Sequence, residues 1–372
     1  MSVLHALLVA TSYPRDIGDW KGRFIHDQAA ALARQGVNVA LWAPPGELPQ
    51  GVTAALASDD ALWLEGLLDQ GGIAHLLRTR PVAGMVEGWR LLRRLRRACR
   101  LASADFYHIN WLQNALSLPD DGRPALVTVL GSDFALLRLP GMVFALRRQF
   151  RRRKTILSPN AEWMTPRLLE LFGTVASIEP NPFGVAAEWF SVERMPDEER
   201  SGWLVVSRIT RGKLGSLIEW GKDLFSPERP LYLLGPLQED IDLPSWILHP
   251  GSTNPVALRE TWFPKVAGLL TLSQHDEGRP QVLIEAMAAG LPVIASRIPA
   301  HEDMIRHGET GWLVASRDAL ANALATAETP EQSARVGMAA REFVLRNIGT
   351  WDACAQRYVA AYRKLLEGGN AM

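Results

Sequence analysis

The run Glu277-Gly-Arg-Pro-Gln-Val-Leu-Ile-Glu-Ala-Met-Ala-Ala-Gly290 is the stretch of this chain that indicates its fold most clearly. Pro280 suits the first position of a helix, where its missing N–H costs nothing, and Gly290 suits the helix end. The apolar residues 291–296 that follow indicate a buried strand. The run therefore predicts a loop, a helix and a strand in succession, as in an α/β fold.

Two carboxylates and two backbone amides surround the start of this helix. Glu277 is expected on the loop and Glu285 in the second helical turn, while the amides of Gly278 and Arg279 lie where a helix N-terminus attracts phosphate. Amides suit a diphosphate and carboxylates suit sugar or ribose hydroxyls, so this is a candidate site for an anionic ligand that carries hydroxyl groups. The alternative is an ordinary helix with a favourable acidic residue near its start.

Strand and helix patterns alternate through both halves of the chain, which predicts parallel, doubly wound sheets. Neither half contains a Gly-x-Gly-x-x-Gly or P-loop pattern, which disfavours dinucleotide-dependent oxidoreductases and the usual NTPases. The expected strands are 3–10, 37–42, 106–110, 125–130, 155–158, 175–179, 203–207, 231–234, 246–249, 266–272, 291–296 and 312–314, and the named helices include 23–35, 214–225 and 255–263.

A run with two prolines, residues 179–184, interrupts the alternation and marks the connection between two domains. We expect an N-terminal, acceptor-side Rossmann-like domain over residues 1–180 and a C-terminal, donor-binding domain over 181–350. The last residues, 351–372, are expected to form a helix that packs back toward the first domain.

Two cations follow the strand 203–207, Arg208 at once and Lys213 five residues later. Ligands of parallel α/β sheets bind outside the carboxyl ends of the strands, so both cations should line the same crevice as Glu277. The planar fork of Arg and the compact charge of Lys suit phosphate oxygens. The alternative is a solvated basic turn.

The run 273–296, followed by His301-Glu302 and by 308–314, closely resembles the donor-site signature of the retaining GT-B glycosyltransferases of family 4, the "glycosyl transferases group 1". The resemblance extends from about residue 8 to the C-terminal helix and is most specific in the donor half. It implies an α/β GT-B fold, with two Rossmann-like doubly wound domains that face each other across a cleft. It also implies transfer of a sugar from a nucleotide sugar to an acceptor hydroxyl with retention of configuration.

The resemblance also implies roles for the donor-side residues. Arg208 and Lys213 match the family's Arg-x4-Lys pair, which neutralises the departing diphosphate. Glu285 would bind the ribose, and Glu277 the hydroxyls of the transferred sugar. The resemblance implies that no bound metal is needed. No cofactor is expected, because the nucleotide-diphosphate sugar is itself the substrate.

The acceptor half matches less closely. Residues 11–15 and 18–26 resemble the family's first loop, in which Gly22 lets the backbone approach the donor phosphate; a tight glycine turn is the alternative. Gly131-Ser-Asp133 resembles the family's cleft loop, but Leu130 replaces the usual His. Asp133 could bind acceptor or donor hydroxyls, or cap the helix that follows.

Asn110 stands where many relatives place a His that contacts the transferred sugar. Asn exchanges hydrogen bonds but cannot shuttle a proton near neutral pH. His108, two residues earlier on the same strand face, could partly substitute or be a core histidine, the interpretation that we favour. Asn110 stays a catalytic candidate and His108 an acceptor-side one, and retention rests on the resemblance because no nucleophile is evident.

Composition indicates an ordinary soluble globular protein, with 47% hydrophobic and 22% charged residues. Residues 1–180 carry 21 Lys and Arg against 16 Asp and Glu, and the remainder 19 against 24, so the halves differ by sign (+5 and −5) without an excess that suggests nucleic acid. Cys99 and Cys354 are too few for a disulfide framework or a zinc site. We expect a cytoplasmic protein without a membrane span.

Two arginine clusters suggest an anionic membrane surface as a partner. At helical spacing, the arginines of the run 89–100 should fall opposite an apolar stripe of Trp89, Leu92, Leu95 and Cys99. The alternative is a solvated basic face on each helix. Peripheral binding at the inner face of a membrane would present the protein to a lipid-linked acceptor. The arginines are Arg90, Arg93, Arg94, Arg96, Arg97 and Arg100 in the first cluster, with residues 147–148 and 151–154 as the second.

The function expected from these features is the synthesis of a cell-surface or exported polysaccharide by glycosyl transfer. One alternative is a non-catalytic nucleotide-sugar-binding subunit of a glycan synthase complex, because the acceptor motifs depart from the family pattern while the donor motifs are intact. A nucleotide-sugar epimerase is a further alternative.

Overall fold

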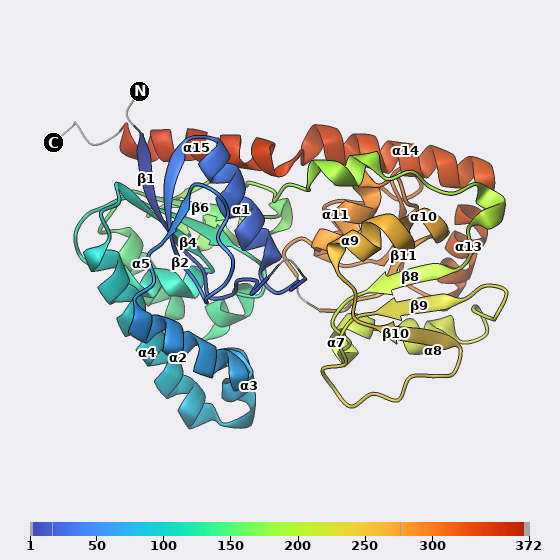
Figure 1. The fold of residues 1–372 in the computed structure, drawn as a ribbon, viewed down its shortest axis with the longest axis horizontal. Coiled ribbons are helices and arrows are strands. Elements are labelled where there is room, and N and C mark those ends of the chain that lie inside the picture. The colour runs from blue at the N-terminus through green and yellow to red at the C-terminus, as the bar shows by residue number, and fades with distance from the viewer. Residues whose placement is uncertain (1–2, 17, 276, 368–372) are drawn as a thin grey trace. The chain divides into compact units, whose positions relative to one another are not determined.

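The computed structural model describes residues 3–16, 18–275 and 277–367 (Figure 1). Contacts divide the chain into two compact units. Unit 1 comprises Met1–Phe183 and Trp351–Met372, and unit 2 comprises Gly184–Thr350. Each unit contains one sheet of parallel strands with helices around it, so the prediction of two Rossmann-like α/β domains is confirmed.

The sheet of unit 1 has seven parallel strands in the order β3-β2-β1-β4-β5-β6-β7. All residues of its central strands are buried, as expected of a parallel sheet covered by helices on both faces. The order reverses between β1 and β4, where such sheets open a crevice at their carboxyl ends. The strands are β1 (Leu4–Val9), β2 (Val37–Trp42), β3 (Val52–Ala54), β4 (Phe106–Asn110), β5 (Ala125–Val129), β6 (Thr155–Pro159) and β7 (Ser177–Ile178).

The helices of unit 1 cover this sheet, and the C-terminal helix α15 (Trp351–Leu366) is one of them. Figure 1 shows α15 beside α1, and Arg34 of α1 forms an ion pair of 2.7 Å with Asp352. The others are α1 (Arg23–Arg34), α2 (Ser58–Asp69), α3 (Gly72–Thr79), α4 (Pro81–Leu101), α5 (Met142–Phe150), α6 (Thr165–Phe172) and the short η1 (Leu112–Ser117), η2 (Phe134–Arg138) and η3 (Glu162–Met164).

The sheet of unit 2 has six parallel strands in the order β10-β9-β8-β11-β12-β13. Its order reverses between β8 and β11. The strands are β8 (Trp203–Val206), β9 (Leu231–Leu234), β10 (Ile247–Gly251), β11 (Gly268–Thr271), β12 (Val293–Ser296) and β13 (Trp312–Val314). The helices are η4 (Ala187–Ser191), η5 (Asp197–Glu199), α7 (Arg211–Leu214), α8 (Leu217–Gly221), α9 (Pro255–Ala257), η6 (Leu258–Trp262), α10 (Phe263–Lys265), α11 (Gln281–Ala288), α12 (Pro299–Glu302), α13 (Arg317–Ala327) and α14 (Pro330–Asn347).

The continuous helix predicted over residues 214–225 is wrong. Two short helices, α7 and α8, replace it, with Gly215 between them at φ 53°. A Cβ at Gly215 would lie 1.9 Å from the carbonyl oxygen of Leu272, so the chain must turn away from helical geometry to pass β11.

The apolar stripe predicted for α4 is also wrong in part. The buried side chains are Leu91, Leu95 and Cys99, whereas the Trp89 residue is 58% exposed. Leu91, Leu95 and Cys99 follow one another at intervals of four residues and so lie on one face of the helix, which is the buried face. Trp89 is not on that face, although it was predicted to be. Among the residues that the structure describes, no helix is long and apolar enough to cross a bilayer.

Candidate functional site

The donor-side residues gather where the strand order of unit 2 reverses. Arg208 follows β8, and Ser273 and Glu277 follow the neighbouring strand β11. Because the two strands are parallel, the loops that carry these residues leave the sheet at the same carboxyl edge. Glu277 is followed by α11, whose first residue is Gln281, one position later than the predicted start at Pro280. Parallel sheets bind their ligands at this kind of edge.

Lys213 and Glu277 form an ion pair, with the Lys213 Nζ 2.6 Å from the Glu277 Oε1. Their side chains are only 16% and 12% exposed. Thr210 caps α7 by accepting a hydrogen bond from the backbone N–H of Lys213 at 3.3 Å, which fixes the position from which the lysine reaches across. The structure therefore brings together two of the residues predicted from the sequence.

The Glu277 carboxylate is ionised in this setting. Burial alone would raise the pKa of Glu277, but the Lys213 ammonium and the hydroxyl of Ser273, which donates to Oε1 at 2.9 Å, outweigh burial and lower the pKa. A carboxylate held in this way is able to accept hydrogen bonds from hydroxyl groups.

Arg208 and Arg211 differ in whether their guanidinium groups are already engaged. Arg208 is exposed, and no carboxylate in the described parts of the chain pairs with it. Arg211 is also exposed, but its guanidinium donates to the Asp240 carbonyl oxygen at 3.1 Å. Arg208 is thus available to an anionic ligand at the carboxyl end of β8.

The predicted phosphate-binding turn is braced from the side. The Arg279 guanidinium pairs with Asp303 at 2.5 Å, and both side chains are below 10% exposed. The side chain of Arg279 therefore supports the turn and is not free for a ligand. The groups predicted to bind phosphate are the backbone amides of Gly278 and Arg279. Glu285 lies partly exposed in the second turn of α11, as predicted.

His301 is a site neighbour to which sequence reasoning gave no role. Its Nδ1 lies 2.8 Å from the Ser296 carbonyl oxygen, so this nitrogen carries the proton. Burial lowers the pKa of His301, which keeps the imidazole neutral, and the Glu277 charge is near enough to oppose that shift. The sequence feature that could have indicated a role for His301 is its place beside Glu302, in the segment that resembles the family's donor-site signature. The imidazole ties α12 to the end of β12 beside the ion pair.

Gly22, in unit 1, is required by the backbone. It precedes α1 at φ 65°, and a Cβ there would lie 2.6 Å from backbone atoms of Ser12 and Tyr13. The tight-turn interpretation accounts for this glycine without a ligand. Its predicted approach to a phosphate is not tested by this geometry.

Asn110 and His108 are both fully buried. The Asn110 amide donates to the Val9 carbonyl oxygen at 3.3 Å and to the Gln28 Oε1 at 3.2 Å. The His108 Nδ1 lies 2.5 Å from the hydroxyl of Tyr362 in α15, and burial lowers the pKa of His108 to about 3. The favoured interpretation of His108, a core histidine, agrees with this packing.

Asp133 is buried, and its carboxylate contacts backbone groups of unit 1. Its carboxylate accepts backbone N–H groups from Leu112 at 2.9 Å and Leu130 at 3.0 Å, and it makes no capping bond to the helix that follows. Burial raises the pKa of Asp133 to about 6 in spite of these bonds. The capping alternative is therefore wrong, because the carboxylate instead holds the loop after β5 against the start of η1.

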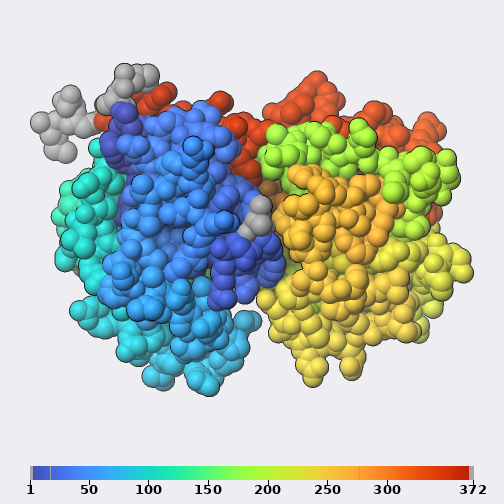
Figure 2. Space-filling model, in the orientation of Figure 1, coloured from blue at the N-terminus to red at the C-terminus, as the bar shows by residue number. Residues whose placement is uncertain are grey.

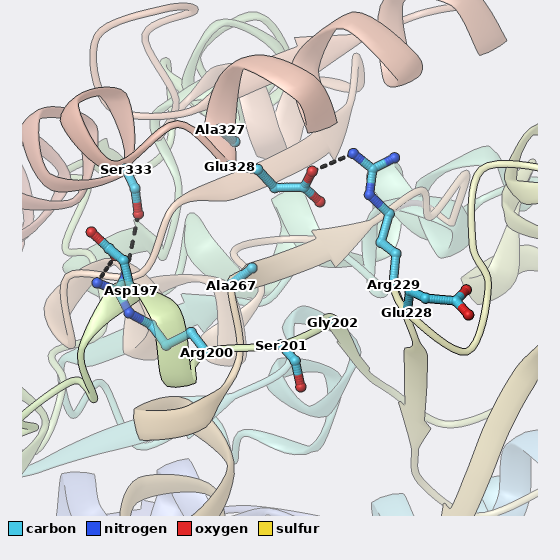
Figure 3. Close-up of a pocket in the computed structure, with 10 residues that line it drawn as sticks. All are labelled: Asp197, Arg200, Ser201, Gly202, Glu228, Arg229, Ala267, Ala327, Glu328 and Ser333. Carbon is cyan, nitrogen blue, oxygen red and sulfur yellow. Dashed lines mark hydrogen bonds and ion pairs between the residues drawn. The ribbon is translucent and has the colours of Figure 1, made fainter.

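A separate cavity of about 200 Å³ lies at the opposite edge of the unit 2 sheet (Figure 3). Its lining includes Gly202 and Ala267, which directly precede β8 and β11. Figure 3 shows Arg229 paired with Glu328, and Arg200 near Asp197 and Ser333. The remaining charged lining residue, Glu228, accepts a hydrogen bond from the Ser226 hydroxyl at 2.7 Å. This cavity therefore does not extend the candidate site.

Comparison with known proteins identifies the class of domain. Residues 263–343, which include α11 and Glu277, match the family described as "Glycosyl transferases group 1". The D-inositol 3-phosphate glycosyltransferase of Streptomyces scabiei is 37% identical over 107 residues, which are 27% of this chain and 23% of that protein. The alignment thus spans less than a quarter of the relative's length.

Solved structures match over the whole chain. Sucrose-phosphate synthase from Thermosynechococcus elongatus has a TM-score of 0.71 at 16% identity and covers 98% of this chain and 100% of its own. Anabaena HepE in complex with UDP-glucose has a TM-score of 0.64 at 13% identity, with 97% and 100% covered. The fold is therefore GT-B, and residues 263–343 constitute a glycosyl transferases group 1 domain.

Proposed function

We propose that this protein is a retaining glycosyltransferase of family 4 that moves a hexosyl group from a nucleotide-diphosphate sugar to an acceptor hydroxyl. The observation that carries the proposal is the largely buried Lys213–Glu277 pair, which lies with the exposed Arg208 at the edge where the strand order reverses. A cation and a carboxylate at that edge match the two parts of a nucleotide sugar, its diphosphate and its hydroxyls. The group 1 domain match, and the UDP-glucose held by HepE, support the same ligand class.

In the proposed reaction the C–O bond between the anomeric carbon and the diphosphate breaks, and the acceptor oxygen bonds to that carbon from the face that the diphosphate leaves. The proton of the acceptor hydroxyl passes to the departing diphosphate oxygen. Negative charge grows on the departing diphosphate. Arg208 and Lys213 would stabilise that charge, together with the amides of Gly278 and Arg279. Glu277 would orient the sugar hydroxyls and Glu285 the ribose, so most of the catalysis is positioning and electrostatic stabilisation.

Lys213 has to exchange partners for this to happen. It is paired with Glu277 at 2.6 Å, whereas the proposed step places its ammonium on the diphosphate. A diphosphate carries more negative charge than one carboxylate and so competes well for the lysine. Release of Glu277 then leaves its oxygens to accept sugar hydroxyls, which couples the two halves of donor recognition.

The donor screen that tests this function starts from binding. Thermal shift with a panel of nucleotide sugars should identify one that raises the melting temperature, and labelled sugar from that donor should appear in a glycan product. Mass spectrometry of products formed with a total lipid extract would identify the acceptor. A panel that gives neither stabilisation nor product would overturn the proposal.

We also propose that the reaction needs no metal. No cluster of three or more His, Cys, Asp or Glu side chains arranged for a metal occurs within the described ranges. The chain does contain Asp240-Ile-Asp242, whose two aspartates lie exposed on the connection between β9 and β10. Turnover should be unchanged by EDTA, and its loss with recovery on adding Mn²⁺ would make these two aspartates the first candidates.

A non-catalytic nucleotide-sugar-binding subunit is a second candidate, and one observation favours it. The acceptor-side residues Asn110, His108 and Asp133 are all buried and engaged within unit 1. Binding of a nucleotide sugar without incorporation of its sugar into any extractable product would favour this candidate. An epimerase would instead convert the nucleotide sugar with no acceptor present.

The proposed biological setting is synthesis of a cell-surface or exported polysaccharide in the cytoplasm. An anionic membrane surface and a lipid-linked acceptor are the partners proposed with it. Excess positive charge in the N-terminal half supports the membrane partner, with 21 Lys and Arg against 16 Asp and Glu over residues 1–180.

A further inference from the structure

Helix α4 has an outward face as well as the face buried on unit 1. At 100° per residue, the side chains at positions 82, 85, 86, 89, 93, 96 and 100 project within about 60° of one direction. The buried Leu91, Leu95 and Cys99 lie on the other side of the helix. We call the first set the outward face; it comprises Val82, Met85, Val86, Trp89, Arg93, Arg96 and Arg100.

The outward face is divided along its length. Its first half is apolar and open to solvent, with Val82, Met85, Val86 and Trp89 between 42% and 70% exposed. Its second half consists of arginines. Figures 1 and 2 show α3 and α4 (light blue) at the end of unit 1 away from α15, with their surface open in the view shown.

The two halves meet at a cation–π pair. The Arg93 guanidinium lies 4.5 Å from the centre of the Trp89 ring. No carboxylate in the described ranges pairs with Arg93 or Arg100, whereas the Arg96 guanidinium is 3.8 Å from Asp120. Two cations of this face are therefore not neutralised by the protein.

The remaining arginines of the helix are neutralised. Arg90 pairs with Glu87 at 2.6 Å, and Arg94 and Arg97 both pair with Asp59 and Asp60. Arg94 and Arg97, which the sequence pattern offered as lipid contacts, instead join α4 to α2. Among the arginines of α4, those without a carboxylate partner in the described parts of the chain thus lie on the outward face.

Self-association through this face is unfavourable in either direction. Two copies packed in parallel would place Arg93 against Arg93 and Arg100 against Arg100, which is repulsive. Two antiparallel copies would bury the arginines of one helix against Val82 and Met85 of the other, and desolvated cations without partners are costly. A partner must therefore be apolar beside one half and anionic beside the other.

We propose that the outward face of α4 docks on an anionic phospholipid bilayer. The apolar half enters the boundary between head groups and acyl chains, as amphipathic helices with Trp and basic residues do. Trp89 lies at the head-group level that tryptophan favours, and Arg93 and Arg100 contact lipid phosphates. The contact depends on bilayer charge through the arginines and on apolar insertion through the first half.

Vesicle co-sedimentation tests the two halves separately, with phosphatidylcholine vesicles that contain or lack 30% phosphatidylglycerol. Arg93→Gln with Arg100→Gln should weaken binding to anionic vesicles about 25-fold, at about fivefold per arginine at low salt. Val82→Gln, Met85→Gln and Val86→Gln together should weaken binding at least tenfold and leave residual binding that is more salt-sensitive.

Matched control variants come from α14, a helix of unit 2. Met338→Gln with Leu345→Gln replaces residues that are 67% and 58% exposed. Arg341→Gln with Arg346→Gln removes two positive charges from the same helix, one of which is paired with Glu342 at 2.5 Å. Both should bind vesicles as the unchanged protein does. Equal binding to neutral and anionic vesicles, or equal losses in the control variants, would overturn the proposal.

A fluorescent label tests which face inserts. Cys99 and Cys354 are buried, so an environment-sensitive fluorophore should react selectively at Met85→Cys or, as the control, at Met338→Cys. The label at position 85 should shift to the blue on anionic vesicles, and the label at 338 should not. A missing shift at 85 despite binding, or concentration-dependent dimerisation abolished by the Val82, Met85 and Val86 changes, would assign the face to another partner.

This inference rests on the membrane partner of the proposed function and names the face that contacts it, but its test does not depend on sugar transfer. None of the altered residues belongs to the candidate donor site, and the vesicle experiments do not use a nucleotide sugar. Failure of vesicle binding with an intact donor response would reject the membrane surface alone, and the converse result would reject only the proposed transferase.

Discussion

The ammonium of Lys213 lies 2.6 Å from the carboxylate of Glu277, although 64 positions of sequence separate the two residues. Parallel strands β8 and β11 are neighbours, so their carboxyl ends deliver α7 and the Glu277 loop to the same place. Each residue neutralises the charge of the other at a site that is largely shielded from solvent. The pair therefore has a structural role before any ligand arrives and a proposed binding role afterwards.

Removing the Arg208 side chain should impair chemistry more than folding. Arg208→Ala should lower turnover at saturating donor by about 10²-fold or more, the loss expected for one preorganised electrostatic group. The matched control is Arg211→Ala, which removes an exposed arginine three residues away and should retain turnover. Steady-state kinetics of the two purified variants provides the comparison. Near-normal turnover of Arg208→Ala would refute the assignment.

Breaking the Lys213–Glu277 pair from one side should destabilise unit 2. Lys213→Met leaves a poorly exposed carboxylate without its cation, which costs about 3 kcal/mol in the free energy of unfolding. Adding Glu277→Gln should restore most of that loss, because the uncompensated charge is removed. Urea unfolding of the single and double variants measures the difference. A single variant as stable as the unchanged protein would mean that the two charges are solvated.

The same pair sets an acid limit on stability. The folded-state pKa of Glu277 is lowered, so its contribution is present above the unfolded-state pKa and is lost as pH falls through the folded-state pKa. The stabilisation lost in Lys213→Met should accordingly shrink in acid. Unfolding measured from neutral pH to pH 3 would show the two proteins converging.

His108 should make stability fall in mild acid. Its native pKa is about 3 against 6.5 for an unburied histidine, so the unfolded chain alone takes up a proton between these values. The contribution of His108 to the free energy of unfolding should then fall as pH decreases, by about 1.4 kcal/mol per unit. His108→Gln, which keeps a hydrogen-bonding side chain near Thr128 and Tyr362, should remove that dependence.

Asp133 opposes this effect and has to be separated from it. Its native pKa of about 6, raised from 3.8, gives the opposite slope between these values. The two contributions nearly cancel in the unchanged protein, so the difference from His108→Gln is the quantity to measure. From pH 6.5 to pH 5 that difference should change by about 2 kcal/mol. An unchanged difference would mean that His108 is protonated in the native state.

Gly22 should tolerate no side chain. Gly22→Ala introduces a Cβ 2.6 Å from backbone atoms and should cost more than about 2 kcal/mol in the free energy of unfolding. Gly36→Ala is the control, because Gly36 also has positive φ, 79°, but has nothing within 4 Å of the added atom. It should cost only about 1 kcal/mol. Equal losses in thermal or urea unfolding would show that positive φ alone accounts for Gly22.

Local sequence pattern determined the strands and the fold class. The strands β2, β4, β9 and β13 have the predicted bounds because apolar runs bordered by polar or turn residues need no distant information to be recognised. The alternation of strands and helices then allows few topologies other than two Rossmann-like units. The Arg208, Lys213 and Glu277 set could also be found from the sequence, because each residue follows a predicted strand.

Tertiary structure decided what each polar side chain contacts. From the sequence, Lys213 could equally have been solvated. It pairs with Glu277 because β8 and β11 are adjacent in the sheet. Asp133 holds the N–H groups of Leu112 and Leu130, and the former comes from a segment 21 positions away. Hydrogen-bond partners at such separations depend on packing, which no local pattern encodes.

Tertiary structure also decided which helices continue and which faces are buried. The helix predicted after β8 breaks at Gly215, because the Leu272 backbone occupies the space that a side chain would need. On α4 the periodicity gave the existence of an amphipathic helix, whereas packing on unit 1 chose Leu91 over Trp89 for the core. Sequence alone determined the elements and their order in the chain; close contacts between distant segments determined their ends, their orientation and the surfaces that remain exposed.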